Sequence, residues 1–193
     1  LVPDYAKKAL SFLPLCHIFE RMVVYMYLVK GISINYAEDL DNIVADINDV
    51  KPQIFTTVPR VLEKVYDKVV EKGKSLSKIK KSIFFWALEL GHNFQEPPKN
   101  NVLYNLKLAI ARKLVFSQWK EALGGNIGLI ISGGAALQER LARVFWAANI
   151  KVLEGYGLTE TSPVIAVNSP VETDIKFGTV GRVLENLKVK IAP

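Results

Sequence analysis

Residues 153 to 163 read LEGYGLTETSP, a stretch that places one carboxylate, Glu160, between two threonines directly after a glycine-punctuated turn. The hydroxyl of Thr159 suits a phosphate oxygen, and a carboxylate is a hard oxygen ligand of the kind that Mg²⁺ takes when it bridges phosphates. The alternative is structural, with Thr159 as a helix N-cap and Glu160 offsetting the roughly +0.5 charge of a helix N-terminus. Because Pro163 and the β-rich VIAV follow, the stretch favours a phosphate and metal site.

A second glycine turn lies upstream, in ISGGAAL at 131 to 137. Glycines between a strand and a helix permit unusual φ values and let a flat or anionic ligand approach the backbone. On its own the stretch fits equally well a tight structural turn with Ser132 near a helix start. Consecutive strands of a βαβ unit lie close together, so we expect both turns side by side. A planar base would then lie between the backbone of 134 to 136 and the ring of Tyr156.

Two basic residues elsewhere are candidates for the same site. His17 follows a strand-like run in LPLCHIFER and stands close to Phe19 and to the charged pair Glu20 and Arg21. A lone histidine is often structural, but its place at the end of a strand favours a ligand-facing role. Arg60 in TVPRVLEKVY begins a helix, where it would meet either a ligand anion or a nearby acid.

Other features predict structure or location rather than chemistry. His92 lies in a helical stretch without polar companions and is expected to be structural, and GTVGRV at 178 to 183 predicts a hairpin or bulge. The single cysteine, Cys16, makes no internal disulfide, and with two histidines it suggests no metal cluster. The longest apolar run, MVVYMYLV, is shorter than the roughly 20 residues of a membrane-spanning helix. These features fit a cytoplasmic protein.

The elements that must position these residues follow from hydrophobic periodicity. Strands are predicted at 9–15, 32–37, 53–58, 126–134 and 151–157, with helices over about 19–30, 40–48 and 138–148. The segment 59–124 is predicted to be all-helical, with Pro97 and Pro98 separating two helices. One apolar face of this segment comprises Leu62, Val65 and Val69, and another comprises Leu103, Leu106, Ile110 and Leu114. In the helix at 138–148, Leu141 and Phe145 are predicted to face inward.

This order predicts an α/β fold with a largely parallel sheet, helical crossovers and an all-helical insertion at 59–124. A β-rich subdomain is predicted to start at 164–193, where VIAVNS and TVGRVLENLKVKIA form short strands. In parallel sheets, ligands bind beyond the carboxyl ends of the strands. The loops that contain His17, 56–60, 132–136 and 156–160 should therefore gather at one edge.

The net charge of +6 concentrates in KGKSLSKIKK at 72 to 81. A solvated helix face explains such a run, and so does peripheral contact with an anionic membrane at its inner face or with a phosphorylated ligand. No RNA- or DNA-binding motif accompanies the run, so nucleic acid is not an expected partner.

In order and spacing, YGLTETSP, ISGGAAL, LPLCHIFER, TVPRVLEKVY and GTVGRV resemble the adenylate-forming (AMP-binding) superfamily. The histidine and VPRVLEKVY segments are similar to its long-chain fatty acid CoA ligases, and the resemblance runs from about Leu10 to Ala192. It implies an acid–thiol ligase with ATP, Mg²⁺ and coenzyme A as cofactor and co-substrates. A fatty carboxylate attacks the α-phosphate of ATP, releasing pyrophosphate, and the CoA thiol then takes the acyl group.

The resemblance also implies a role for each matching position. Tyr156 stacks on adenine, Thr159 contacts phosphate and Glu160 ligates Mg²⁺. His17 falls near the acyl carboxylate and the tunnel entrance, as a third catalytic candidate beside Thr159 and Glu160. The residues that border the adenine and acyl carbonyl or pass close to the substrate are Gly133, Gly134, Ala135, Ala136, Gly157 and Leu158.

Several parts of the family pattern are not in this sequence. The phosphate loop expected upstream of Leu1, the downstream ribose-binding aspartate, the hinge and the lysine-bearing C-terminal domain are absent, so we expect an internal fragment of the N-terminal adenylation domain, inactive alone. Arg21 stands where some long-chain members place an aromatic gate. Alternatives are another carboxylate-activating ligase of the superfamily and a non-catalytic binder of acyl-adenylate or anionic lipid.

Overall fold

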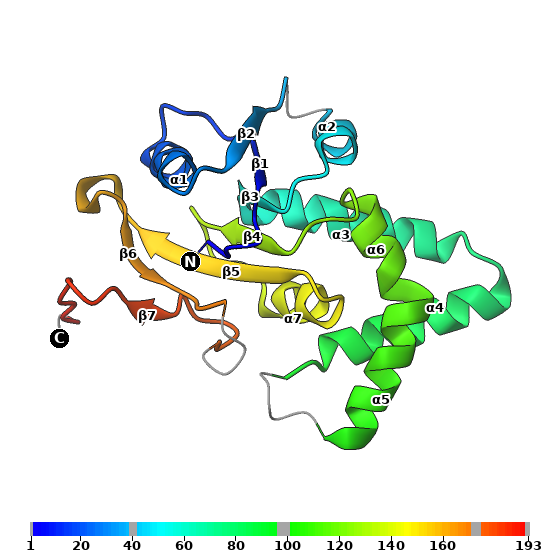
Figure 1. Ribbon diagram of the computed structural model, residues 1–193. Helices are drawn as coiled ribbons and strands as arrows, with labels where there is room; N and C mark the ends of the chain where they lie inside the picture. The colour runs from blue at the N-terminus through cyan, green and yellow to red at the C-terminus, as the bar shows by residue number, and fades with distance from the viewer. Residues whose placement is uncertain (1, 39–41, 96–100, 171–174, 192–193) are drawn as a thin grey trace.

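The computed structural model describes residues 2–38, 42–95, 101–170 and 175–191 (Figure 1). Over these residues, seven strands form one sheet in the order β2-β1-β3-β4-β5-β6-β7. The strands are β1 Lys8–Ser11, β2 Ser33–Tyr36, β3 Ile54–Thr57, β4 Leu129–Ser132, β5 Lys151–Gly157, β6 Val164–Val167 and β7 Arg182–Val183.

The first five strands in the chain pair in parallel, which confirms the predicted α/β fold with helical crossovers. All four residues of β3 and all four of β4 are buried, as expected where helices cover both faces of a sheet. Strands β6 and β7 then join in antiparallel pairs. The parallel part places the carboxyl ends of β1, β3, β4 and β5 along one edge.

Helices make up the rest of the regular structure. They are α1 Ile18–Val29, α2 Ile43–Val50, α3 Pro59–Lys74, α4 Lys78–His92, α5 Val102–Ala111, a π-helical turn at Arg112–Phe116, α6 Ser117–Ala122, α7 Glu139–Ala147 and a 3₁₀ turn at Thr159–Thr161. Helices α3 to α6 are grouped on one side of the sheet (Figure 1). Leu141 and Phe145 of α7 are fully buried, as the periodicity predicts.

One prediction from the pattern is wrong. The alternation in LKVKIA predicted a strand, but only Arg182 and Val183 pair with β6, and residues 184–191 form no strand. A strand needs a neighbour for its backbone groups, and in this segment the N–H of Leu184 donates to the carbonyl of Ile165 in β6 at 3.0 Å, while no other described residue outside the segment forms a backbone hydrogen bond with 185–191. The apolar helix face that comprises Leu103, Leu106, Ile110 and Leu114 is exposed.

The helix that begins at Val102 is instead buried through its opposite face. Leu108, Ala111 and Val115 belong to the hydrophobic core, and α5 and the π-helical turn pack on α4. In α3 the prediction was correct, because Leu62 is buried and Val65 and Val69 pack against the core. Pro97, Pro98 and the first residues of the predicted helix at 40–48 lie outside the described residues.

Candidate functional site

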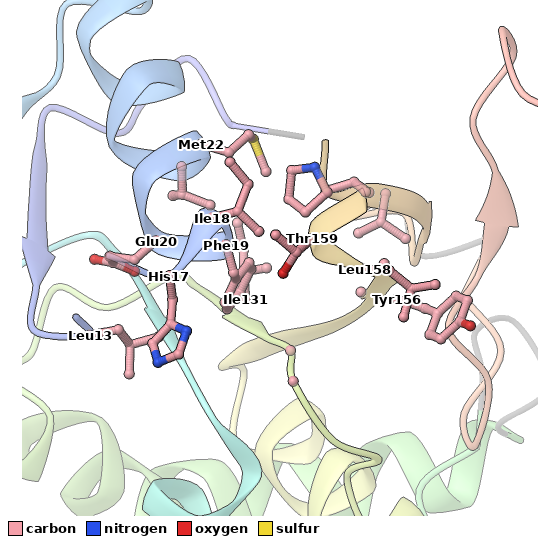
Figure 2. A pocket seen from close by; sticks show the side chains of 18 of the residues that line it. Leu13, His17, Ile18, Phe19, Glu20, Met22, Ile131, Tyr156, Leu158 and Thr159 are labelled. Atoms are coloured by element: carbon pink, nitrogen blue, oxygen red, sulfur yellow. The ribbon is translucent and has the colours of Figure 1, made fainter. Parts of the chain in front are cut away.

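A cavity of about 570 Å³ lies at the edge where the parallel strands end. Its lining includes His17 after β1, Val58 after β3, Gly133 and Gly134 after β4, and residues 155–159 from the end of β5 onward. The four predicted loops therefore meet at one site, as the parallel topology requires. Figure 2 shows the rings of His17 and Tyr156 at opposite sides of the view, with Thr159 between them.

One wall of the cavity is apolar. Helix α1 contributes Ile18, Phe19, Met22, Val23 and Met26 to the lining (Figure 2). Further apolar residues come from β4, β6 and the segment after β7, namely Ile131, Val164, Val167 and Leu184. Methionine is unbranched and flexible, so this wall suits a long apolar chain. Apart from the residues next to His17, this part of the lining was not predicted from the sequence.

The turn that carries Thr159 and Glu160 is held by the next threonine, Thr161. The Thr161 hydroxyl donates to the carbonyl of Pro163 at 2.6 Å and also lies 2.9 Å from the carbonyl and the N–H of Leu158. The backbone N–H of Leu158 donates to Pro163 as well, at 3.0 Å. Thr161 therefore has the structural role that the sequence left open for Thr159, whose side chain makes no hydrogen bond to the described residues.

Glycines are required at two points of the site. A Cβ on Gly157 would lie 1.8 Å from the carbonyl oxygen of Pro163, so no side chain fits there. Gly134 has φ +80°, a left-handed conformation that favours glycine. A Cβ on Gly133 would lie 3.0 Å from the Phe19 ring, so the glycine turn and the apolar wall are in close contact.

Other predicted site residues lie outside the cavity lining. Ala135, Ala136 and Glu160 are exposed next to lining residues. The side chain of Arg60 is 77% exposed and pairs with Glu63 at 3.5 Å, which favours the ion-pair interpretation.

Two more residues have packing roles. Nε of Arg21 donates to the carbonyl of Leu15 at 3.0 Å and so holds the loop before α1. Nε2 of His92 lies 3.0 Å from the Tyr66 hydroxyl, inside the helical layer, the name used here for helices α3 to α6. His92 thus has the structural role predicted for it.

Glu154, a buried carboxylate on β5, was not among the site residues predicted from the sequence. Its Oε2 accepts the backbone N–H of Leu137 at 3.2 Å, and Leu137 closes the glycine turn after β4. Burial raises the pKa of Glu154, and the Leu137 hydrogen bond opposes that increase. Glu154 therefore joins the two glycine-bearing segments of the site.

We expect Glu154→Ala to loosen the glycine turn, because the buried N–H of Leu137 loses its acceptor at a cost of about 1–3 kcal/mol. Hydrogen exchange of the peptide that covers 133–138 should become faster in the complete protein that contains this chain. Glu154→Gln retains an acceptor oxygen and should preserve most of the protection. Equal exchange in Glu154→Ala and the unchanged protein would contradict this role.

Glu20 is a second buried carboxylate that the sequence did not distinguish from a surface charge. It accepts hydrogen bonds from the hydroxyls of Ser11, at 2.5 Å, and Thr56, which belong to β1 and β3. Its side chain is inaccessible to solvent. Burial raises its pKa, and the two hydroxyl donors oppose the shift. Glu20 thus connects the start of α1 to the carboxyl ends of β1 and β3.

Glu20→Gln should change how stability depends on pH. A carboxyl whose folded-state pKa is raised contributes stability that is fully present below its unfolded value of about 4.3 and is lost as the pH rises through the folded value. Glutamine does not ionise, so the melting temperature of Glu20→Gln relative to that of the unchanged protein should rise as the pH is raised from about 4 through the folded-state pKa of Glu20. Exposed Glu185→Gln is the control, and a pH-independent difference for Glu20→Gln would contradict the prediction.

The donors at the turn fit Mg²⁺ in one specific way. Among the described residues, no group of three or more His, Cys, Asp or Glu side chains is placed to hold a metal ion. Mg²⁺ in nucleotide sites is commonly held by one or two carboxylates together with water and substrate phosphates. Exposed Glu160, which has no ion pair within the described ranges, and the adjacent Thr159 fit that pattern.

Comparison with known proteins agrees with this architecture. A family model described as AMP-binding enzyme matches residues 3–192. Long chain acyl-CoA synthetase 3 of Arabidopsis thaliana is 37% identical over 186 residues, covering 94% of this chain and 27% of that protein. The long-chain-fatty-acid–CoA ligase FadD15 of Mycobacterium bovis is 31% identical over 189 residues, covering 96% of this chain and 31% of that protein. The chain thus spans under a third of the length of these relatives.

Solved structures share the fold. The N-terminal domain of FACL13 from Mycobacterium tuberculosis superimposes with a TM-score of 0.58 and 18% identity, over 95% of this chain and 35% of that one. A variant of MenE from E. coli with bound OSB-AMS gives a TM-score of 0.59 and 17% identity, over 100% of this chain and 30% of that one. Because the family model covers nearly every residue, the chain belongs to the family of AMP-binding enzymes.

Proposed function

We propose that the complete protein containing this chain is a long-chain fatty acid CoA ligase, an acid–thiol ligase driven by ATP. The observation that carries this proposal is the cavity, in which a polar, glycine-rich rim from the strand ends meets an apolar wall from α1. Such a site suits an amphipathic substrate whose polar end reacts while its apolar part is buried. The similarity to long-chain acyl-CoA synthetases supports this substrate class.

The nucleotide is proposed to bind along the two glycine turns. The backbone at Gly133 and Gly134, with the neighbouring Ala135 and Ala136, would border the adenine, and the half-exposed ring of Tyr156 would stack on it. Gly157 and Leu158 would pass close to the reacting atoms, since both line the cavity. This arrangement would orient the α-phosphate toward the apolar wall, from which the fatty carboxylate would approach.

The three catalytic candidates would act on charge and position. Thr159 would donate its hydroxyl to a phosphate oxygen, and His17, at the other side of the cavity, would orient the acyl carboxylate. Glu160 would hold Mg²⁺, which when bound neutralises phosphate charge and so lowers the repulsion between ATP and the carboxylate. The thiol of CoA would then attack the acyl carbonyl of the adenylate in the same cavity, forming the thioester and releasing AMP. A cytoplasmic location accompanies the proposal, because the exposed thiol of Cys16 suits a reducing compartment.

The proposal is tested by pyrophosphate release from the complete protein with Mg-ATP and a panel of acids that differ in chain length and aromaticity. Palmitate should give the highest rate, and addition of CoA should yield palmitoyl-CoA. A preference for an aryl or medium-chain acid would point to another carboxylate-activating ligase, and no release with any acid would point to a binder. The isolated chain is expected to release none, because it spans under a third of the length of its relatives.

A further inference from the structure

The helical layer carries an exposed apolar surface far from the cavity. On α4 it comprises Ile79, Ile83 and Trp86, and on α5 and the π-helical turn it comprises Leu103, Leu106, Ile110 and Leu114. Their spacing places each set on one helix face. Leu103 and Leu106 are 62% and 60% exposed, and Ile79 is 77% exposed. We call these seven residues the helical surface.

The two halves of the helical surface adjoin. Ile83 of α4 and Leu114 of the π-helical turn line the same groove of about 350 Å³, together with apolar residues of α3 and α6. The Tyr104 hydroxyl donates to the carbonyl of Leu90 at 2.7 Å, which fixes the start of α5 against the end of α4. The two helices therefore run in opposite directions with their exposed stripes on neighbouring elements (Figure 1).

Positive charge surrounds this apolar area. Residues 72 to 120 contain ten Lys and Arg and two Asp and Glu, a net charge of +8 against +6 for the whole sequence, so the remainder carries a slight negative excess. Lys72 and Lys80 line the groove. Lys107 and Lys113 are exposed on the helix that carries the leucine stripe. The basic run at 72–81 is therefore part of a larger positively charged region, which also includes the lysines 25 to 40 residues further along the sequence.

We propose that the helical surface docks on a lipid bilayer that carries anionic headgroups. Apolar side chains on adjoining helices with lysines around them are the pattern of interfacial membrane binding, in which the apolar face enters the headgroup boundary. Lysines near an anionic leaflet add attraction that depends on lipid charge and is screened by salt. No helix in the described ranges is long and apolar enough to span a membrane, so docking would be peripheral.

The helical surface and the reacting atoms are separate in space. Helix α3 starts directly after Val58, which lines the cavity, and reaches the groove at Lys72 and Gly73. At a rise of about 1.5 Å per residue this is roughly 20 Å. Docking would thus hold the enzyme at a membrane without occupying its cavity. The inference does not depend on the proposed function, since it uses no cavity residue.

Vesicle sedimentation of the complete protein tests the inference. Binding should be weak on phosphatidylcholine vesicles and at least about tenfold stronger when phosphatidylserine is included, and it should fall as salt is raised. The combined variant Lys80→Glu, Lys107→Glu and Lys113→Glu should bind phosphatidylserine-containing vesicles at least about tenfold more weakly than the unchanged protein. The pair Leu106→Ser and Ile110→Ser should weaken binding to both kinds of vesicle.

Matched variants elsewhere control for net charge and hydrophobicity. Lys30→Glu, Lys188→Glu and Lys190→Glu make the same charge change at exposed positions outside the helical layer, and they should retain at least half of the binding to phosphatidylserine vesicles. The control for the apolar pair is Tyr25→Ser with Val29→Ser, two exposed positions on α1. Equal losses in the control and test variants would overturn the inference, as would binding that ignores phosphatidylserine.

Two further measurements exclude other occupants of the surface. In the complete protein with Leu106→Cys, the new thiol should react with a maleimide in solution and be protected by anionic vesicles; because Cys16 is also an exposed thiol, labelling is measured on the peptide that contains position 106. Protection without vesicles would mean that protein already covers the surface, and a change of oligomeric state in the Leu106→Ser, Ile110→Ser pair would mean a second copy; either result overturns the inference. Pyrophosphate release with water-soluble octanoate should be the same in the variant with three Lys→Glu changes as in the unchanged protein. A loss of membrane binding can therefore be distinguished from a loss of enzymatic activity.

Discussion

Replacing Glu160 with alanine in the complete protein is expected to reduce pyrophosphate release about 10³-fold while the fold is retained. A metal ion that neutralises phosphate charge contributes several kcal/mol to the transition state, and each 1.36 kcal/mol corresponds to a factor of ten. Glu160 is exposed and has no ion pair within the described residues, so its removal should cost little stability. The measurement is single-turnover formation of the acyl-adenylate at saturating Mg-ATP.

Two companions make the Glu160 result specific. Glu160→Asp keeps a carboxylate and should raise the Mg²⁺ concentration required for half-maximal rate. The control is Glu121→Ala, at an exposed position of α6, which should change neither the rate of pyrophosphate release nor this Mg²⁺ concentration. Melting temperatures of all three variants should agree with that of the unchanged protein. Release by Glu160→Ala at the unchanged rate would remove Glu160 from the metal site, whatever the acid activated.

Gly157→Ala is expected to lower the same rate at least about 10²-fold, through position rather than charge. The added Cβ would lie 1.8 Å from the carbonyl oxygen of Pro163, and that carbonyl accepts the bonds that close the turn. The turn must open to relieve this overlap, which displaces Thr159 and Glu160. A shift of about 1 Å in a reacting group is enough for a loss of this size.

Gly155→Ala is the matched control, because it adds the same methyl group two residues earlier on β5. A Cβ there meets Val167 at 3.7 Å, an ordinary contact, so we expect a loss below about tenfold. Hydrogen exchange of the peptide that covers 156–163 should increase in Gly157→Ala and not in Gly155→Ala. Similar rates for the two variants would show that the turn tolerates displacement and that Thr159 and Glu160 are not positioned by it.

The location of the site was predictable because it depends mainly on strand order. Runs rich in β-forming residues, such as IFTT and LIIS, alternate with helical stretches and predict parallel strands whose carboxyl ends share one edge. That argument alone brings His17 and Thr159 to one cavity, although more than 140 residues separate them in the sequence. It could not assign their chemical roles, which rest on the family resemblance.

The buried carboxylates were not predictable because their partners are distant in the chain. Glu20 receives the hydroxyls of Ser11 and Thr56, which lie 9 and 36 residues away. Glu154 receives an N–H from Leu137, 17 residues upstream. Periodicity reports which face of an element is apolar, but it contains no information about a hydroxyl or N–H that the tertiary fold brings to a charged side chain.

The orientation of α5 was not predictable for a different reason. The sequence VLYNLKLAIA has apolar residues on both sides of the helix, so the pattern does not select between the face of Leu106 and the face of Leu108. Packing against α4 selects the second. The strand predicted near the C-terminal end shows the same limit, since alternation describes a strand's faces but not whether a neighbour exists to pair with it.

The contact between Phe19 and Gly133 brings the two halves of the cavity together. The ring of Phe19 belongs to the apolar wall, and the absent side chain of Gly133 is what lets it touch the glycine turn. In a close-packed interior, a ligand that moves the wall must also move the turn. By reciprocity, whatever factor a bound acid applies to nucleotide affinity, the nucleotide applies to acid affinity. Under the proposed function, the contact between Phe19 and Gly133 would therefore be one path by which the acid and the nucleotide influence each other's binding.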